Sequence, residues 1–223
     1  MFKKYWKFFV IFWSVLLVGI IGVFVFFWLI SAGKLGFMPT FEELENPNNR
    51  FASEVYFADG PIMNRYFEKE NRKYIEYREI PQSVIDALIA TEDVRFYDHS
   101  GIDVRGLFRV AKGLLTANTS AGGGSTISQQ LAKMLFPRES DLNVFELVIR
   151  KFREWVIAVR LEKSYTKEEI LTMYLNKYDF LNLAVGISSA ADIYFQVPLD
   201  SLKVEQAAML VGMAKNSSYY NQI

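Results

Sequence analysis

The sequence predicts a mainly α-helical protein in which one N-terminal membrane-spanning helix precedes a helical domain. Three observations lead to this prediction. Residues 8–33 form a run of 26 residues without a charged side chain. Apolar residues recur at helical spacing through most of the chain after residue 80, and short β-type runs are confined to the segment between these two parts. A chain of 223 residues is long enough for one anchor and one globular domain of ordinary size.

The composition excludes several classes of function. The 25 basic residues, three of which lie at the N-terminus, balance 25 acidic ones, so no nucleic-acid partner is expected. The chain has no cysteine and one histidine, His99. A disulfide framework, a thiolate zinc site and a multi-histidine metal centre are therefore not expected. No cofactor is predicted, although the sequence leaves open a requirement for a divalent cation.

The apolar run at residues 8–33 is the predicted membrane anchor. At ~1.5 Å per residue it is longer than the ~30 Å hydrocarbon core of a bilayer. A cleaved signal peptide is the alternative, but its apolar core would span only about 7–15 residues. Lys3, Lys4 and Lys7 precede the run and only Lys34 follows it closely. Residues 1–7 are therefore expected to form a cytoplasmic tail, with residues 34–223 on the outer side.

Residues 34–80 are expected to form an extended connector with short strands. Residues 53–57 and 74–77 are the β-type runs. Turns are expected at Asn46-Pro47, at Asp59-Gly60-Pro61 and at Pro81.

The remainder, 81–223, is expected to form the helical domain. Thr166 and Glu169 have the spacing of a capping box, which marks the start of a helix through Leu175. Another helix is expected to follow the glycines at 122–124. Helical spacing of apolar residues predicts the other helices over residues 81–91, 104–115, 141–163, 183–195 and 204–215.

Glu92 and Asp93 follow directly on the apolar helix at 81–91, and Phe96, Tyr97 and His99 come next. A carboxylate at the end of a buried helix, beside aromatic side chains, would be partly removed from water, as a general base requires. The alternative is a solvated helix end. His99 on its own is more typical of a structural hydrogen-bonding group than of a catalyst.

The glycines at 122–124 run into Ser125-Thr126-Ile127-Ser128-Gln129-Gln130, and Lys133 lies one turn further on. Thr126 and Gln129 have capping-box spacing, so backbone N–H groups are expected to point out of the helix start, where a diphosphate would bind favourably. The Gly-Lys-Ser/Thr ending of nucleotide-binding loops is missing. A flexible lid or a plain linker is the alternative.

Two further segments carry polar residues at helical spacing. Arg150 and Lys151 lie one turn before Glu154, so one helix face would carry a carboxylate flanked by two cations. These charges suit a phosphate leaving group, and the alternative is an ordinary surface ion pair. The segment from Lys167 to Asn176 alone indicates only an amphipathic helix that ends near an asparagine.

Together and in this order, the four segments resemble the glycosyltransferase family 51 domain of class A penicillin-binding proteins and monofunctional peptidoglycan glycosyltransferases. The resemblance runs from about Ala52 to Tyr220. Its motifs are E-D-x-x-F-x-x-H-x-G from Glu92, G-x-S-T-I-x-Q-Q ending at Gln130, R-K-x-x-E ending at Glu154 and K-x-x-I-L-x-x-Y-L-N ending at Asn176.

The resemblance implies a lysozyme-like helical fold whose substrates are lipid II and a growing glycan strand. It implies that Glu92 is the general base towards the acceptor sugar 4-hydroxyl and that Glu154 serves the donor side, with inversion to a β-1,4 link. The substrate-binding residues implied by the motifs are Asp93, Phe96, His99, Gly124, Ser125, Thr126, Gln129, Gln130, Lys133, Arg150, Lys151 and Asn176.

The function expected from this resemblance is lipid II polymerisation on the outer face of a bacterial inner membrane, with release of undecaprenyl diphosphate. Cell-wall synthesis or division proteins are candidate partners. The alternatives are a lysozyme-like lytic enzyme that cleaves glycan and a catalytically silent, membrane-anchored scaffold.

The sequence departs from the family at three places. Ser128 replaces the usual threonine, residues 177–185 lack the usual glycines, and the chain stops at Ile223 before a fifth, arginine-containing motif. A truncated domain is therefore expected, and any transpeptidase domain would lie beyond it.

Overall fold

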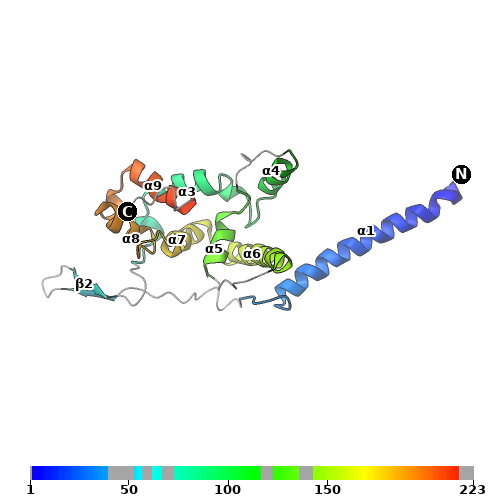
Figure 1. Ribbon diagram of the computed structural model, residues 1–223, viewed down its shortest axis with the longest axis horizontal. Coiled ribbons are helices and arrows are strands. Elements are labelled where there is room, and N and C mark those ends of the chain that lie inside the picture. Colours follow the sequence, from blue (N-terminus) through cyan, green and yellow to red (C-terminus); the bar gives the residue numbers. More distant parts are fainter. Residues whose placement is uncertain are drawn as a thin grey trace.

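The computed structural model describes residues 2–39, 53–56, 62–66, 73–116, 123–135 and 143–215. Within these ranges the chain is mainly helical, which confirms the predicted class. Helix α1 (Phe2–Ser31) projects from one end of the domain. An antiparallel two-stranded sheet, β1 (Ser53–Tyr56) and β2 (Ile62–Tyr66), lies at the other end (Figure 1). The turns expected at residues 46–47 and 59–61, and Gly122, lie outside the described ranges.

The helices after residue 76 alternate with short connections. In chain order they are η1 (Tyr77–Glu79), α3 (Gln82–Glu92), η2 (Phe96–Asp98), α4 (Val104–Leu115), α5 (Ile127–Leu135), α6 (Val144–Ser164), α7 (Lys167–Lys177), α8 (Ile187–Phe195), η4 (Leu199–Ser201) and α9 (Val204–Lys215).

The core of the domain lies between α3, α5, α7, α8 and α9. Leu88 of α3, Leu131 of α5 and Leu171 of α7 are fully buried in it, as are Ala190 of α8 and Leu210 of α9. Helices α3 and α9 pack side by side although they are far apart in the sequence (Figure 1). This packing brings the C-terminal ends of both helices to the same region of the molecule.

Most helix boundaries agree with the predictions, and capping explains two differences. Helix α6 starts at Val144, three residues later than expected, because the Asn143 side chain accepts a hydrogen bond from the Glu146 N–H group and Glu146 reciprocates. The predicted capping box of Thr166 and Glu169 is confirmed. Helix α7 extends to Lys177, because the Tyr178 N–H group still bonds to the Tyr174 carbonyl.

The prediction of a strand at residues 74–77 is wrong. Residues 73–76 have no regular structure, and η1 starts at Tyr77. The backbone of Ile75 pairs with a side chain instead of with another strand. Its N–H group donates to Oδ1 of Asn176 (3.0 Å), and its carbonyl accepts from Nδ2 of the same residue (2.9 Å).

The helix expected from residue 183 starts only at Ile187. Leu181, Asn182 and Leu183 all have positive φ angles, between 50° and 68°. Left-handed backbone of this kind ends regular helix, and an antiparallel bridge joins Asp179 to Val185. The segment thus forms a tight loop, and Gly186 at φ 86° leads into α8.

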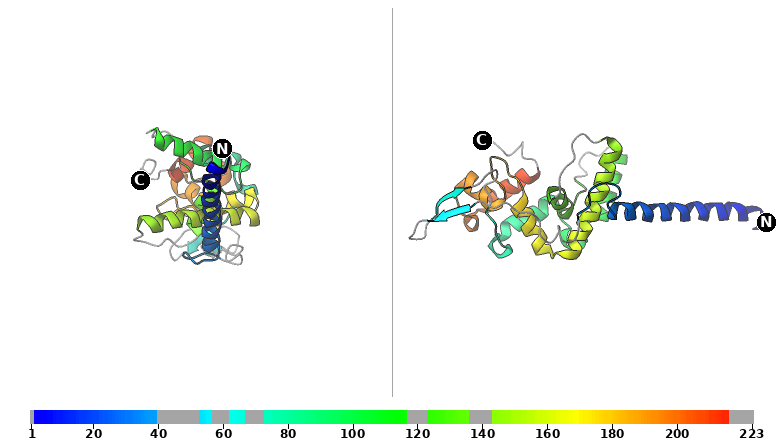
Figure 2. Two further views of the ribbon diagram at one scale, coloured as in Figure 1. Left: turned by 90° about the vertical axis from the view of Figure 1, so that its right-hand side faces the viewer. Right: turned by 90° about the horizontal axis from the view of Figure 1, so that it is seen from below.

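Helix α1 is long and apolar enough to cross a membrane, over Tyr5–Ser31 with a mean hydropathy of 2.8. The last turns of α1 pack on α6. Phe26 and Phe27 meet the ring of Phe152 edge to face at 5.3 and 5.6 Å. The Arg160 guanidinium donates to the Ser31 carbonyl (2.9 Å) and to the Pro39 carbonyl (3.0 Å). As Figure 2 shows, α6 crosses the end of α1 steeply, so this helix forms the face of the domain nearest the anchor.

Candidate active site

Glu92 is the last residue of α3, and its two carboxylate oxygens have different surroundings. Oε2 accepts a hydrogen bond of 2.6 Å from Nε2 of Gln130, in the second turn of α5. Oε1 is buried and has no hydrogen-bond partner among the described residues. A buried oxygen without a partner is unusual. Oε1 is therefore the carboxylate oxygen of Glu92 that no described protein group occupies.

A cavity of about 310 Å³ lies beside Glu92. Its wall combines the end of α3, the start of α4, the glycine-rich turn before α5 and the last residue of α9. The predicted site residues that line it are Glu92, Asp93, Gly124, Ser125 and Thr126. The structure thus brings the first two sequence motifs to one cavity.

The same cavity has charged residues that were not among the predicted site residues. Arg95 pairs with Asp103 at 2.5 Å, and this hydrogen bond holds the pKa of Asp103 below its usual range. Arg109 donates to the Gly123 carbonyl, and Lys215 donates to the Thr91 carbonyl at 3.0 Å. Lys215 lies 124 residues from Thr91. No local pattern signals such a contact, whereas Arg95 and Asp103 lie in or beside the first motif.

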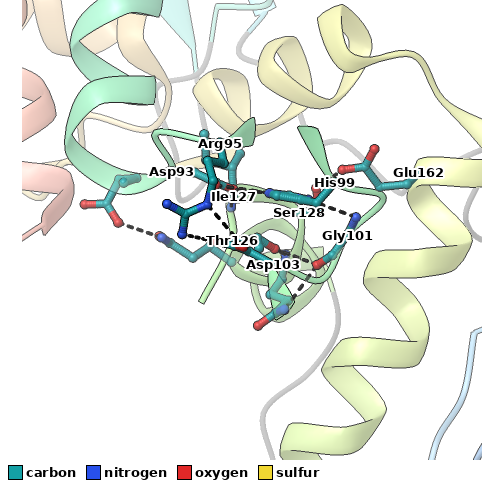
Figure 3. Close-up of polar contacts among 12 residues, drawn as sticks. Asp93, Arg95, His99, Gly101, Asp103, Thr126, Ile127, Ser128 and Glu162 are labelled. Atoms are coloured by element: carbon teal, nitrogen blue, oxygen red, sulfur yellow. Dashed lines mark hydrogen bonds and ion pairs between the residues drawn. The ribbon is translucent and has the colours of Figure 1, made fainter. Parts of the chain in front are cut away.

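The carboxylate of Asp93 is buried, and its hydrogen-bond partners belong to the protein itself. It accepts hydrogen bonds from Nε2 of His99 (3.0 Å) and from the backbone N–H group of Ile127 (3.0 Å), as Figure 3 shows. The Gly101 N–H group donates to Nδ1 of His99, so the ring proton belongs on Nε2. Asp93 therefore joins the end of α3 to the start of α5, and His99 donates to the same carboxylate.

Two of the backbone N–H groups that were expected to bind an anion at the start of α5 have partners within the protein. The Ile127 N–H group points to Asp93, and the Gln129 N–H group donates to Oγ1 of Thr126 (3.2 Å). The Gln129 side chain does not complete a capping box, because its Nε2 donates to the Gly101 carbonyl (3.1 Å). The protein's own carboxylate occupies the position that was expected to bind a diphosphate.

Gly101 is the centre of this set of contacts (Figure 3). Its carbonyl accepts hydrogen bonds from Thr126 and Gln129. Its φ angle is 92°, and a Cβ atom there would lie 2.8 Å from the carbonyl carbon of Ala158. Only glycine fits this close approach to α6.

Phe96, which was predicted to bind substrate, belongs to the core and does not line this cavity. It is fully buried, and the Lys167 ammonium lies 4.2 Å from its ring centre. Lys167 also donates to the His99 carbonyl and to Glu162, which accepts a hydrogen bond from the Ser128 hydroxyl. Lys167 thereby ties α7 to α5, α6 and the loop after α3.

The second predicted carboxylate, Glu154, lies on α6 and is paired with one cation. Nζ of Lys151 donates to Oε2 of Glu154 (2.9 Å) and to Oγ of Ser125 (2.9 Å). The side chain of Glu154 is 12% exposed and that of Lys151 is 41% exposed, so the carboxylate of this pair is mostly covered while the lysine reaches solvent. Ser125 lines the cavity beside Glu92, so Lys151 joins Glu154 to one residue of the cavity wall.

Three other expected residues lie apart from this arrangement. No ion pair joins Arg150 to Glu154 within the described ranges, although their spacing suggested one. Lys133 is exposed and does not line the cavity. Both ends of the Asn176 amide are used by backbone, at Ile75 and at the Thr172 carbonyl. Asn176 therefore holds residue 75 against α7.

Within the described residues, no group of three or more His, Asp or Glu side chains could hold a metal ion.

The fold and the site define a helical domain with one carboxylate, Glu92, in the wall of a polar cavity and a second, Glu154, joined through Lys151 to Ser125 of that wall. The chain belongs to the transglycosylase family, whose pattern matches residues 59–223. Similar proteins include penicillin-binding protein 1A of Escherichia coli (36% identity over 83% of this chain) and of Pseudomonas aeruginosa (37% over 83%). Penicillin-binding protein 1A of Neisseria gonorrhoeae is 34% identical over 92% of this chain. The chain spans 21% to 24% of the length of these relatives.

Proposed function

We propose that the chain is a peptidoglycan glycosyltransferase that polymerises lipid II into β-1,4 glycan strands and releases undecaprenyl diphosphate. Its family membership and its relatives named penicillin-binding protein 1A support this activity. The observation that carries the proposal is the buried, unpartnered Oε1 of Glu92 at a polar cavity.

In the proposed reaction, Glu92 acts as general base. Oε1 takes the proton of the acceptor sugar 4-hydroxyl while that oxygen attacks the anomeric carbon of the donor. The bond from the anomeric carbon to the diphosphate oxygen breaks, and its electron pair leaves with the diphosphate. Attack opposite the leaving group inverts the anomeric centre. Gln130 holds Oε2 throughout, so that Oε1 stays without a protein partner.

The leaving diphosphate needs neutralisation of negative charge more than it needs a proton. Lys151 is the proposed cation, because its ammonium lies between Ser125 and Glu154. Glu154 orients that ammonium. Arg150 and Lys133 would add positive charge along the path of the diphosphate from the cavity to the membrane.

The proposed orientation has residues 1–7 in the cytoplasm and the domain on the outer face of a bacterial inner membrane, because lysines cluster before the apolar span. The proposed division of the chain is a span at 8–33, a connector at 34–80 and a catalytic domain at 81–223. An anchor at the membrane raises the encounter rate with a lipid-linked substrate. Cell-wall synthesis or division proteins are the proposed class of partner.

The test is polymerisation of lipid II by the purified full chain in detergent, followed by separation of the products on a gel. We expect glycan polymer from the unchanged chain and none from Glu92→Gln, which keeps the size of the side chain. Asp86→Asn is the matched control, because Asp86 is an exposed carboxylate on the same helix. Full activity of Glu92→Gln would refute the assigned base.

The same preparation separates the alternatives. A lytic enzyme would release soluble fragments from finished peptidoglycan and would form no polymer. A catalytically silent scaffold would do neither.

A further inference from the structure

Three side chains from three helices form a hydrogen-bonded row that ends at the proposed base. The hydroxyl of Tyr174, on α7, donates to Oε1 of Gln130 on α5 (3.1 Å). Nε2 of the same amide donates to Oε2 of Glu92 on α3 (2.6 Å). The residues of these two pairs are 44 and 38 positions apart in the sequence. The row therefore depends on how the helices pack and not on any local motif.

The tyrosine at the far end of the row is held in one place and in one protonation state. Tyr174 is fully buried, and its ring stacks on that of Tyr178 with a centroid separation of 5.7 Å. Burial first, and then the negative charge of Glu92, raise the pKa of Tyr174 well above its ordinary value. Its hydroxyl group therefore keeps its proton and can donate it to Gln130.

The amide in the middle of the row has two ends of opposite character. Its NH₂ group can donate to an ionised carboxylate, whereas its carbonyl oxygen would be repelled by one. Which end faces Glu92 depends on what holds the other end. In this structure the hydroxyl group of Tyr174 donates to Oε1 of Gln130, so the NH₂ group of Gln130 faces Glu92.

We propose that Tyr174 is a positioning residue for the reaction, because its hydroxyl fixes the Gln130 amide that holds Oε2 of Glu92 and leaves Oε1 free. This inference rests on the proposed function, in which Glu92 is the base. Tyr174 itself does not line the cavity. It acts only through Gln130, and loss of its hydroxyl leaves the amide free to turn its carbonyl oxygen towards the carboxylate.

A double-mutant cycle on lipid II polymerisation tests this dependence. We expect Tyr174→Phe to lower kcat by about tenfold with KM changed less than about twofold, because the loss is in the orientation of the base. Gln130→Met should lower kcat further. In the Gln130→Met background, Tyr174→Phe should have no further effect on kcat. All variants are compared at a temperature at which circular dichroism shows the full helical signal.

Tyr194→Phe is the matched control. Tyr194 also donates its hydroxyl to an oxygen acceptor, the Phe180 carbonyl (2.6 Å), but it lies on α8 and does not contact Gln130. The kcat of the Tyr194→Phe variant should equal that of the unchanged chain. Unchanged kcat in Tyr174→Phe would overturn the proposal. So would a decrease in kcat by the same factor whether position 130 is glutamine or methionine.

A second measurement does not depend on activity. The side-chain amide resonances of Gln130, assigned by their loss in Gln130→Met, should shift in Tyr174→Phe and remain in place in Tyr194→Phe. If these resonances respond as expected but the unchanged chain forms no polymer from lipid II, the proposed function fails and the row of hydrogen bonds stands. Unmoved resonances in Tyr174→Phe would refute the orienting role even in an active enzyme.

Discussion

The ammonium of Lys151 donates a 2.9 Å hydrogen bond to the hydroxyl of Ser125, across 26 positions of sequence. This contact connects α6 to the glycine-rich turn that walls the cavity beside Glu92. The same ammonium donates to Glu154. A single cation of α6 is therefore held at two points, by Ser125 and by Glu154.

Removal of this cation should affect the chemical step more than binding. We expect Lys151→Met to lower kcat by about 100-fold, because charge on a leaving diphosphate is stabilised mainly in the transition state. Steady-state kinetics with lipid II measure this value. Lys163→Met is the control, since Lys163 is exposed near the end of the same helix. A decrease of less than about threefold in Lys151→Met would remove Lys151 from the donor side.

Asp93 should matter for stability as well as for activity. Asp93→Asn keeps the shape of the side chain but presents an NH₂ group to His99 or to the Ile127 N–H group, both of which are donors. We expect the free energy of unfolding to fall by about 1–3 kcal/mol. Urea denaturation followed by circular dichroism measures it.

The exposed neighbour Asp98 provides the comparison for Asp93. Asp98→Asn should change the free energy of unfolding by less than about 0.5 kcal/mol. Equal stability of the two variants would show that the contacts of Asp93 do not hold α3 to α5.

Local signals in the sequence predicted most of the helices, because a capping pair such as Thr166 and Glu169 and the spacing of apolar residues act within a few positions. The box of Asn143 and Glu146 has the same pattern and could have been found. The left-handed run at residues 181–183 has no glycine, so nothing in the composition indicated it.

The candidate site was predicted less completely, because its contacts are long-range. Motif order was sufficient to select Glu92 and Gln130, but it could not show that they bond to each other. Asn176 and Ile75 are 101 positions apart, and their pairing takes the place of the strand expected at residues 74–77. The roles of such residues depend on packing, which sequence spacing does not report.

The contact between α1 and α6 should restrain the segment after the anchor. Arg160 holds the carbonyl groups of Ser31 and Pro39, so we expect Arg160→Met to speed hydrogen exchange of the amides at residues 32–38. Mass spectrometry of the exchanged protein in detergent measures this rate. Lys163→Met should leave it unchanged. Identical exchange in the two variants would mean that the aromatic contact of Phe152 is sufficient to hold the anchor.

Alkaline pH should destabilise the protein partly through Tyr174. Its pKa in the folded state is raised above the ordinary value of 10.0. A group with a raised folded-state pKa contributes stability that is fully present below its unfolded-state pKa and is lost as the pH rises through the folded-state value. Between neutral pH and about pH 11, one tyrosine that ionises in the unfolded state and stays protonated in the folded state lowers the free energy of unfolding by about 1.4 kcal/mol.

Tyr174→Phe removes this ionisation and keeps the ring. The unchanged chain should therefore lose more stability than Tyr174→Phe between neutral pH and about pH 11, by the amount of that one group. Thermal unfolding across this range measures the difference, and absorbance of tyrosinate at high pH shows whether Tyr174 ionises before the helices unfold. Tyr178 also has a raised pKa, from burial first and then from the charge of Glu92, and it is present in both proteins, so its contribution cancels. Parallel stability curves for the two proteins would mean that Tyr174 ionises without resistance in the folded state. Its hydroxyl would then not be the fixed donor that orients Gln130.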